Sequence, residues 1–112
     1  MRAIKEAAIL AHAKRQSKRL GLRFIRLSMR QGVEVGWPDV LILGPVGASI
    51  GDGKQVWFET KAPGKPLKPI QMVRRSEIES RGGLYDKPDT IEAVDAALHG
   101  FVKYCLAHGG DV

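Results

Sequence analysis

A short apolar run over residues 39–43 (DVLIL) constrains the fold of this chain more than any other feature of its sequence. The run follows Pro38, opens with Asp39 and is apolar at the four positions after that carboxylate. A short run of this kind, with no polar residue inside it, is typical of a central β-strand that is covered on both faces. We therefore expect a sheet with helices packed on either side of it.

The remaining segments predict an order of elements around this strand. We expect a helix over 2–20 that ends at Gly21, strands over 22–30, 39–43 and 55–61, a helix from residue 68 or 69 to about 80, a short strand over 84–86 and a final helix. The strands 39–43 and 55–61 should form a hairpin-like pair across the glycine-rich residues between them. The order α-β-β-β-α-β-α favours an α/β or α+β sandwich. A length of 112 residues suits one domain over 1–112.

The final predicted helix carries an apolar stripe made of Ile91, Val94, Ala97, Leu98, Phe101, Val102 and Cys105. We expect this stripe to pack on the sheet. Asp89 is expected to cap the helix, because Glu92 follows it by three residues as in a capping box. Cys105 is the only cysteine, and we interpret it as a buried apolar thiol. Since it has no disulfide partner within the chain, a reducing cytoplasm is the expected compartment.

The N-terminal segment predicts neither export nor membrane insertion. Lys5, Glu6 and His12 make it too polar for a signal peptide. No apolar run approaches the roughly 20 residues that are needed to span a bilayer. We therefore expect no membrane partner.

Positive charge is concentrated in two segments. Residues 1–35 carry nine Lys and Arg against two acidic residues, and residues 54–81 carry seven against three, within a chain of net charge +6. A surface with this distribution favours a polyanion such as nucleic acid as its partner. We expect the contacts to be mainly with the phosphate backbone, from Lys14, Arg15, Lys18, Arg19, Lys65 and Lys68 among others.

The chemistry is expected where the strand 39–43 begins and the strand 55–61 ends. If these strands pair, Asp39 and Glu59 meet at one end of the sheet. Glu59 and Lys61 are two residues apart, so their side chains leave the same face of a strand. Two carboxylates in one cleft repel each other, and a hard divalent cation such as Mg²⁺ would relieve that repulsion. The carbonyl of Thr60 could add a neutral oxygen ligand, and Lys61 could orient a water or neutralise charge on a phosphate.

At this point the sequence resembles a known family. The stretch GWPD at 36–39, ETK at 59–61, Gln71 on the following helix and the triplet Val73-Arg74-Arg75 are similar to the VRR-NUC family of PD-(D/E)xK nucleases. The similarity spans roughly residues 4–83, with the final helix as a peripheral addition. It implies a restriction-endonuclease-like fold, in which a mixed sheet is flanked by helices.

The resemblance also implies roles for individual residues. Asp39 and Glu59 correspond to the metal-binding carboxylates, and Lys61 corresponds to the catalytic lysine. Glu6 matches an N-terminal glutamate that can complete the metal or water network, and Gln71 matches a glutamine that orders the active site. Arg74 and Arg75 follow Gln71 by one helical turn, and we expect them to contact phosphate. The implied cofactor is Mg²⁺ or Mn²⁺.

Stand-alone members of the family from phages and bacteria resemble Holliday-junction resolvases and work as homodimers. The resemblance therefore implies an endonuclease for branched DNA and a symmetric dimer. Two other readings stay open: a non-catalytic nucleic-acid-binding module on the same fold, and a nuclease for RNA or for linear DNA ends.

Several other signals predict no separate chemistry. The loop over 47–55 lacks the residues of a phosphate-binding P-loop, and we interpret it as a flexible hairpin loop that can approach DNA. His12, His99 and His108 lack metal-ligand spacing. Core packing is the expected role of Trp57, and Trp37 is a weaker candidate for stacking on a base.

Overall fold

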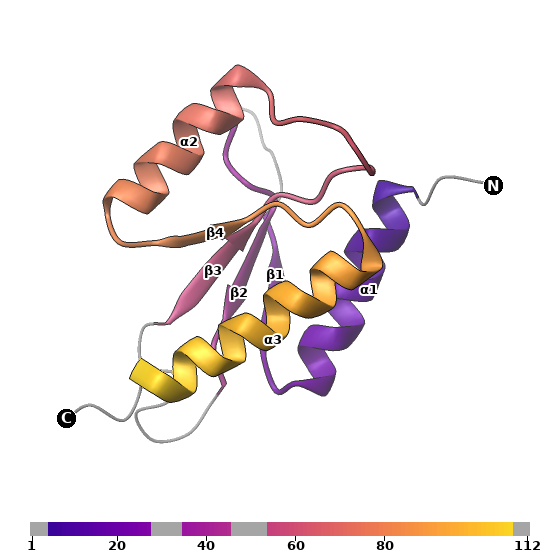
Figure 1. Ribbon diagram of the computed structural model, residues 1–112, viewed down its shortest axis with the longest axis vertical. Helices are drawn as coiled ribbons and strands as arrows, with labels where there is room; N and C mark the ends of the chain where they lie inside the picture. The colour runs from indigo at the N-terminus through magenta and orange to yellow at the C-terminus, as the bar shows by residue number, and fades with distance from the viewer. Residues whose placement is uncertain (1–4, 28–34, 46–53, 109–112) are drawn as a thin grey trace.

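The computed structural model describes residues 5–27, 35–45 and 54–108. In chain order the elements are α1 (Glu6–Arg19), β1 (Arg23–Arg26), β2 (Val40–Leu43), β3 (Gln55–Phe58), α2 (Pro69–Ser80), β4 (Leu84–Asp86) and α3 (Ile91–His108), as Figure 1 shows. The predicted α/β class and the order α-β-β-β-α-β-α are confirmed. Most of the predicted loop over 47–55 lies outside the described residues.

The four strands of the described part form one mixed sheet in the order β1-β2-β3-β4. β1 pairs with β2 and β2 with β3 in antiparallel register, so the predicted hairpin-like pair is confirmed. β4 pairs with β3 in parallel, because α2 carries the chain back to the starting end of β3. The crossover from β3 to β4 therefore places α2 against one face of the sheet.

The two faces of the sheet are covered by different helices (Figure 1). α1 and α3 lie on one face, and α2 lies on the other. Side chains alternate along β2 and β3, so that Val40, Ile42, Val56 and Phe58 are buried in the core with α1 and α3. The odd-numbered residues between them project toward α2, and so do Glu59 and Lys61, which follow β3 in the same alternation. The expectation of a strand covered on both faces is thus confirmed.

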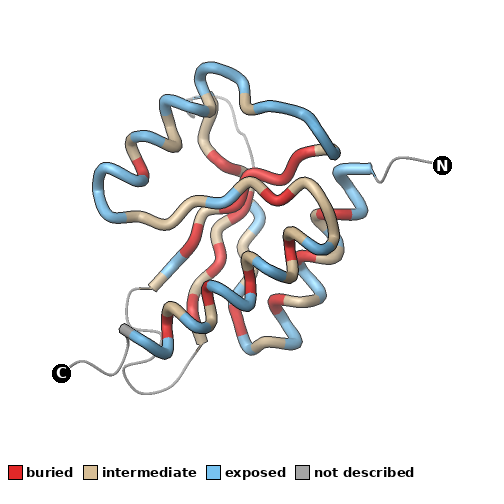
Figure 2. Tube along the Cα trace, viewed as in Figure 1, coloured by how far each residue is buried: buried red, intermediate tan, exposed pale blue. Residues whose placement is uncertain are grey.

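The last helix is an integral part of the core. Val94, Leu98, Phe101 and Cys105 of α3 are buried in the same cluster as the strands, along one side of the helix that Figure 2 shows in red. The expectation that this helix is a peripheral addition was wrong, whereas the predicted packing on the sheet and the buried thiol of Cys105 are confirmed.

The predicted cap of the last helix was wrong by one residue. Thr90 Oγ1 accepts a hydrogen bond of 2.9 Å from the N–H of Ala93, as an N-cap residue does. Asp89 instead accepts one of 3.3 Å from the N–H of Gly64. The hydroxyl of Thr90 takes the capping position, which frees the carboxylate one residue earlier to hold the segment between β3 and α2.

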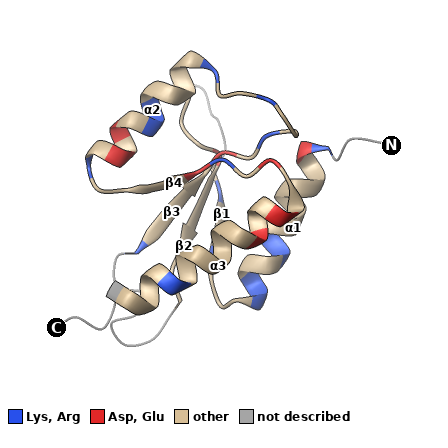
Figure 3. Cartoon of the chain, in the orientation of Figure 1, with Lys and Arg blue, Asp and Glu red and all other residues tan. Residues whose placement is uncertain are grey.

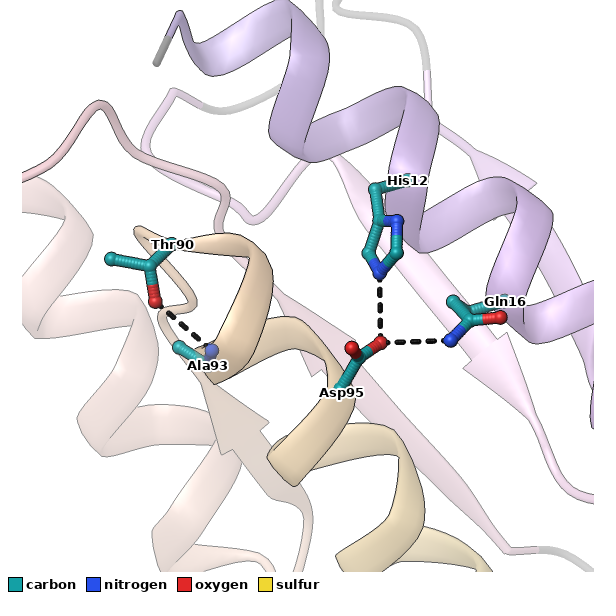
Figure 4. Close-up of polar contacts among 5 residues, drawn as sticks. All are labelled: His12, Gln16, Thr90, Ala93 and Asp95. Atoms are coloured by element: carbon teal, nitrogen blue, oxygen red, sulfur yellow. Dashed lines mark hydrogen bonds and ion pairs between the residues drawn. The ribbon is translucent and has the colours of Figure 1, made fainter. Parts of the chain in front are cut away.

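A polar contact fixes α1 against α3 (Figure 4). Asp95 Oδ1 lies 2.8 Å from His12 Nε2 and accepts a hydrogen bond of 2.9 Å from Gln16 Nε2. These hydrogen bonds, from Gln16 and then His12, lower the pKa of Asp95 below its usual value. His12 therefore has a structural role between two helices.

Within the described residues, no helix is long and apolar enough to cross a membrane.

Candidate active site

The two carboxylates predicted from the sequence meet at the junction of β2 and β3. The antiparallel ladder ends with Val40 opposite Phe58, and one further step in the same register sets Asp39 opposite Glu59. After burial, the charge of Asp39 is the largest cause that raises the pKa of Glu59. The two side chains therefore lie close enough to interact electrostatically, and their joint role in binding a metal stays a prediction.

The segment from Glu59 to Lys61 continues the sheet beyond β3. The N–H of Glu59 donates to the Asp86 carbonyl at 3.0 Å, and the N–H of Lys61 donates to the Pro88 carbonyl at 3.3 Å. The extended backbone keeps both side chains on the face that carries α2. Glu59 and Lys61 are only 6% and 8% exposed, which is rare for charged residues and requires them to compensate each other.

The pKa of Glu59 is raised from 4.5 to about 7. Burial is the main cause, and the charge of Asp39 adds to it, while the ammonium of Lys61 acts in the opposite direction. Near neutral pH the site thus holds a proton that a divalent cation could replace.

Asp39 has one carboxylate oxygen that is weakly paired and one that has no partner. Its Oδ2 lies 3.8 Å from Nη2 of Arg26, the last residue of β1. Its Oδ1 is buried without a hydrogen-bond donor. Because an unsatisfied buried oxygen is costly, this atom is the strongest sign in the site of a ligand that supplies positive charge.

Thr60 is the predicted neutral ligand. Two steps beyond the β2–β3 ladder, the register sets Thr60 opposite Pro38, which has no N–H to donate to a neighbouring carbonyl. The proline before Asp39 therefore removes one potential competitor for the Thr60 carbonyl oxygen, which leaves it suited to bind a cation.

Gln71 joins the first turn of α2 to the site. Its Oε1 accepts a hydrogen bond of 2.8 Å from the N–H of Lys68, and its Nε2 donates to Oε1 of Glu59. The amide thus caps the helix at one end and orients the carboxylate at the other. The sequence resemblance had assigned Gln71 to this position.

Tyr85 is a member of the site that the sequence did not indicate. It lies opposite Trp57 in the parallel pair of β3 and β4, and its buried hydroxyl has no hydrogen-bond partner. Burial, followed by the charge of Glu59, raises its pKa above the ordinary value for a tyrosine. Only the pairing of β4 with β3 reveals this neighbour, and the sequence gives no signal for that pairing.

The two arginines of α2 pack on aromatic rings. The guanidinium of Arg74 lies 5.0 Å from the centre of the Trp37 ring, and its Nε donates to the Val35 carbonyl. The guanidinium of Arg75 lies 5.0 Å from the centre of the Tyr85 ring, and its Nε contacts Glu79 at 3.2 Å. The side chain of Arg74 is 12% exposed and that of Arg75 is 44% exposed. Their expected contact with phosphate stays a prediction, and Arg75 is the better placed of the two.

The other predicted residues fall into separate regions. Lys65 and Lys68 are exposed between β3 and α2, next to the carboxylates along the chain. Lys14, Arg15, Lys18 and Arg19 are exposed on α1, in the other layer (Figure 3). Glu6 is exposed at the start of α1 and does not form a group of three with Asp39 and Glu59, since the described residues contain no metal-binding group of that size. Its role in the metal or water network stays a prediction.

The donor set fits a hard divalent cation. Asp39 and Glu59 supply carboxylate oxygens, and Thr60 supplies a carbonyl oxygen. Magnesium is commonly bound by one or two carboxylates together with water and substrate phosphates, so a larger protein cage is not needed. The unpartnered Oδ1 of Asp39 gives such an ion an open ligand.

Solved structures with similar folds carry one description. No family model and no curated protein matches the chain. A structure described as a VRR_NUC domain has a TM-score of 0.72 and 24% identity, over 87% of this chain and 97% of its own. A second, described as a VRR_NUC domain protein, has a TM-score of 0.69 and 19% identity, over 91% of each chain. The resemblance predicted from the sequence is thus confirmed for the fold: the chain has the fold of the structures described as VRR_NUC domains.

Proposed function

We propose that the protein is a divalent-metal-dependent DNA endonuclease that hydrolyses phosphodiester bonds. The observation that carries this proposal is the register that sets the half-buried Asp39 opposite the buried Glu59, two residues before the buried Lys61. A fold maintained only for stability gains little from a buried acid next to a half-buried one, because both cost desolvation energy. A site that binds a cation and a phosphate uses all three side chains.

Each residue has a distinct task in hydrolysis. Asp39, Glu59 and the Thr60 carbonyl would hold Mg²⁺ or Mn²⁺, which supplies a Lewis acid and an acidified water when bound. Gln71 fixes the orientation of Glu59 through its amide N–H. Lys61 neutralises charge on the phosphate as the water oxygen bonds to phosphorus and one phosphorus–oxygen ester bond breaks. The attacking water releases one proton to solvent, and the departing oxygen takes up a proton from solvent.

We further propose that the substrate is branched DNA and that the protein acts as a homodimer. The exposed lysines at positions 65 and 68 support backbone contact beside the site. A junction has two strands to cut at a fixed separation, and a twofold dimer provides two sites in that relation. The non-catalytic module on the same fold is a weaker proposal, because a pure binder gains nothing from carboxylates that face phosphates.

A cleavage assay tests the activity and the substrate together. The protein is incubated with a linear duplex, a flap and a four-way junction, with and without Mg²⁺ or Mn²⁺, and an RNA strand is included as a fourth substrate. We expect metal-dependent cutting of the branched DNA, abolished by Asp39→Asn and by Lys61→Ala. The control variant is Glu92→Gln, which removes an exposed charge on α3 and should cut normally.

Binding of junctions without any cutting by the unaltered protein would overturn the enzyme proposal and favour the binding module. Cutting of RNA or of linear ends alone would favour the third reading. For the dimer, a single species near 12.3 kDa in a mass measurement at micromolar concentration would contradict the proposal.

A further inference from the structure

A cavity of about 250 Å³ lies on the α2 face of the sheet, next to the candidate active site. Its walls include the rings of Trp37 and Trp57 and the side chain of Ile78, together with the polar side chains of Gln55, Glu77 and Arg81. None of the catalytic tasks assigned above uses these groups. The cavity therefore has aromatic walls and a polar lining without an assigned ligand.

We propose that this cavity binds a single unpaired nucleobase from the nucleic acid strand that crosses the active site. The two tryptophan rings have centres 6.2 Å apart and are tilted by 40°. They are not stacked in parallel, so a flat ligand can lie against one ring with its edge toward the other. Arg74 packs on Trp37 and bonds to the Val35 carbonyl, which holds this wall in place before a ligand arrives.

The size and the lining of the cavity suit a base. Pockets for drug-sized ligands occupy about 300–1,000 Å³, so a space of about 250 Å³ admits one planar ring system and little more. The amide of Gln55 offers donors and an acceptor, and Arg81 offers donors. Glu77 Oε1 already accepts from Nη1 of Arg74 at 3.2 Å, so its Oε2 is the acceptor that it offers. Base edges carry both donors and acceptors, whereas a purely apolar ligand would use none of these groups.

The position of the cavity relative to the carboxylates supports a polynucleotide ligand. Trp57 precedes Glu59 by two residues on the same face of the extended chain, which corresponds to roughly 7 Å along the strand. A phosphate held at Glu59 and Lys61 therefore has the base of a neighbouring nucleotide within reach of Trp57. This step rests on the proposed function, since it takes those residues as the phosphate site.

The ligand must be unpaired. A base inside a duplex is stacked on both faces and paired along its edge, so it cannot enter a cavity without leaving the stack. The substrate class is therefore a nucleic acid with an unpaired nucleotide beside the bond that is cut, as at a flap or a branch point.

The two tryptophans of the chain make a direct binding assay possible. Trp37 and Trp57 are the only tryptophans, so all tryptophan emission reports on this cavity. The protein is titrated in EDTA with three probes: single-stranded oligothymidylate, an abasic strand of the same length and a blunt duplex. We expect the oligothymidylate to quench the emission, and the other two to bind without comparable quenching. Equal quenching by the abasic strand would overturn the proposal.

A substitution tests whether a base stacks on Trp57. Trp57→Ala should weaken binding of a labelled oligothymidylate by about 5- to 100-fold, the usual loss for one stacked base. Tyr104→Ala is the matched control, because it removes a ring that does not line this cavity, and its affinity should be unchanged.

If Trp57→Ala does not fold, Trp57→Phe and Gln55→Ala replace it. Trp57→Phe retains a ring, and Gln55→Ala removes only an edge contact from an exposed position. We expect Gln55→Ala to reduce the difference in affinity between thymidylate and adenylate strands. Unchanged affinity and unchanged base preference in both variants would overturn the proposal.

The binding assay also separates this inference from the proposed function. Metal-dependent cutting that requires Asp39 and Lys61, but occurs without quenching, would refute the base cavity and leave the nuclease intact. Quenching by oligothymidylate without cutting of any substrate would support the base cavity and contradict the nuclease proposal.

Discussion

The side-chain N–H of Gln71 donates to Oε1 of Glu59, while the carbonyl oxygen of the same amide accepts from the N–H of Lys68. One side chain therefore connects the start of α2 to the most strongly perturbed carboxylate of the described residues. Two substitutions separate its role as a helix cap from its role as a positioning residue.

Gln71→Ala removes both hydrogen bonds and should cost about 1 kcal/mol of stability through the lost cap. It should also reduce cleavage by about 10- to 100-fold, as loss of a group that orients a metal ligand does. Gln71→Glu keeps the acceptor for Lys68 but places a third carboxylate against Glu59, so its stability should match the wild type at pH 5.5 and fall below it at pH 8. Thermal unfolding and cleavage rates measure these effects, with Ser76→Ala on the exposed side of α2 as the control. Equal cleavage by wild type and Gln71→Ala would contradict a positioning role.

The raised pKa of Glu59 predicts an unusual dependence of stability on pH. The folded state holds a proton up to about pH 7, whereas the unfolded chain loses it near 4.5. The folded state therefore binds more protons between these values, and stability should fall as the pH rises from about 4.5 through about 7. The decrease should be on the order of 3 kcal/mol at most, before other groups contribute.

Glu59→Gln tests this origin, because it should remove the decrease between pH 5 and pH 8 in urea unfolding curves without metal. For the wild type, affinity for Mg²⁺ by calorimetric titration should rise over the same range, since the ion competes with the proton. Parallel pH profiles for wild type and variant would assign the dependence to other groups.

Gly36 is the glycine whose replacement should damage the site. Its φ is +92°, and a Cβ atom there would lie 2.6 Å from Cγ1 of Ile70 and 3.0 Å from the Ile70 carbonyl oxygen. The close approach holds the segment before Asp39 against the start of α2. Gly64 has a φ of +78° but open space around it, so it isolates the cost of the backbone conformation.

We expect Gly64→Ala to cost about 1–2 kcal/mol and Gly36→Ala clearly more, because the second adds a steric clash to the same strain. Chemical unfolding of both variants measures the difference. If the two losses are equal, the contact with Ile70 is not a constraint on the fold.

Much of this fold follows from local patterns in the sequence. The apolar run after Asp39 predicted β2, alternation over residues 22–30 predicted β1, and Gly82-Gly83 marked the end of α2 close to where it occurs. The position of Asp39 opposite Glu59, near Lys61, was predictable for the same reason, since adjacent strands fix which of their ends meet. The placement of Gln71 beside Glu59 was predicted from the resemblance to the family.

What the sequence did not predict depends on contacts between distant segments. Tyr85 enters the site only because β4 pairs in parallel with β3, and a three-residue strand carries no signal for its neighbour. The packing of Arg74 on Trp37 and its hydrogen bond to the Val35 carbonyl also join segments that are distant in the sequence. The sequence predicted Asp89 as the cap of α3, whereas Thr90 is the cap. Both residue types can cap a helix, and only the tertiary contact of Asp89 with Gly64 distinguishes them.

Two pairs of basic residues can be compared to test which surface of the protein contacts DNA. Lys65 and Lys68 follow the carboxylates directly, whereas Lys18 and Arg19 end α1 near the start of β1, away from the end of β1 that contacts Asp39. Both double variants, Lys65→Ala with Lys68→Ala and Lys18→Ala with Arg19→Ala, remove two positive charges. Each phosphate contact that is lost should reduce the slope of log affinity against log salt by about 0.9. We expect the first pair to lose up to about 1.8 in slope on a four-way junction and the second clearly less, measured by anisotropy between 50 and 200 mM salt, a range over which phosphate contacts weaken steeply. A larger loss for the α1 pair would mean that DNA lies mainly across the α1 layer, and the strand would then have to reach the carboxylates around the edge of the sheet.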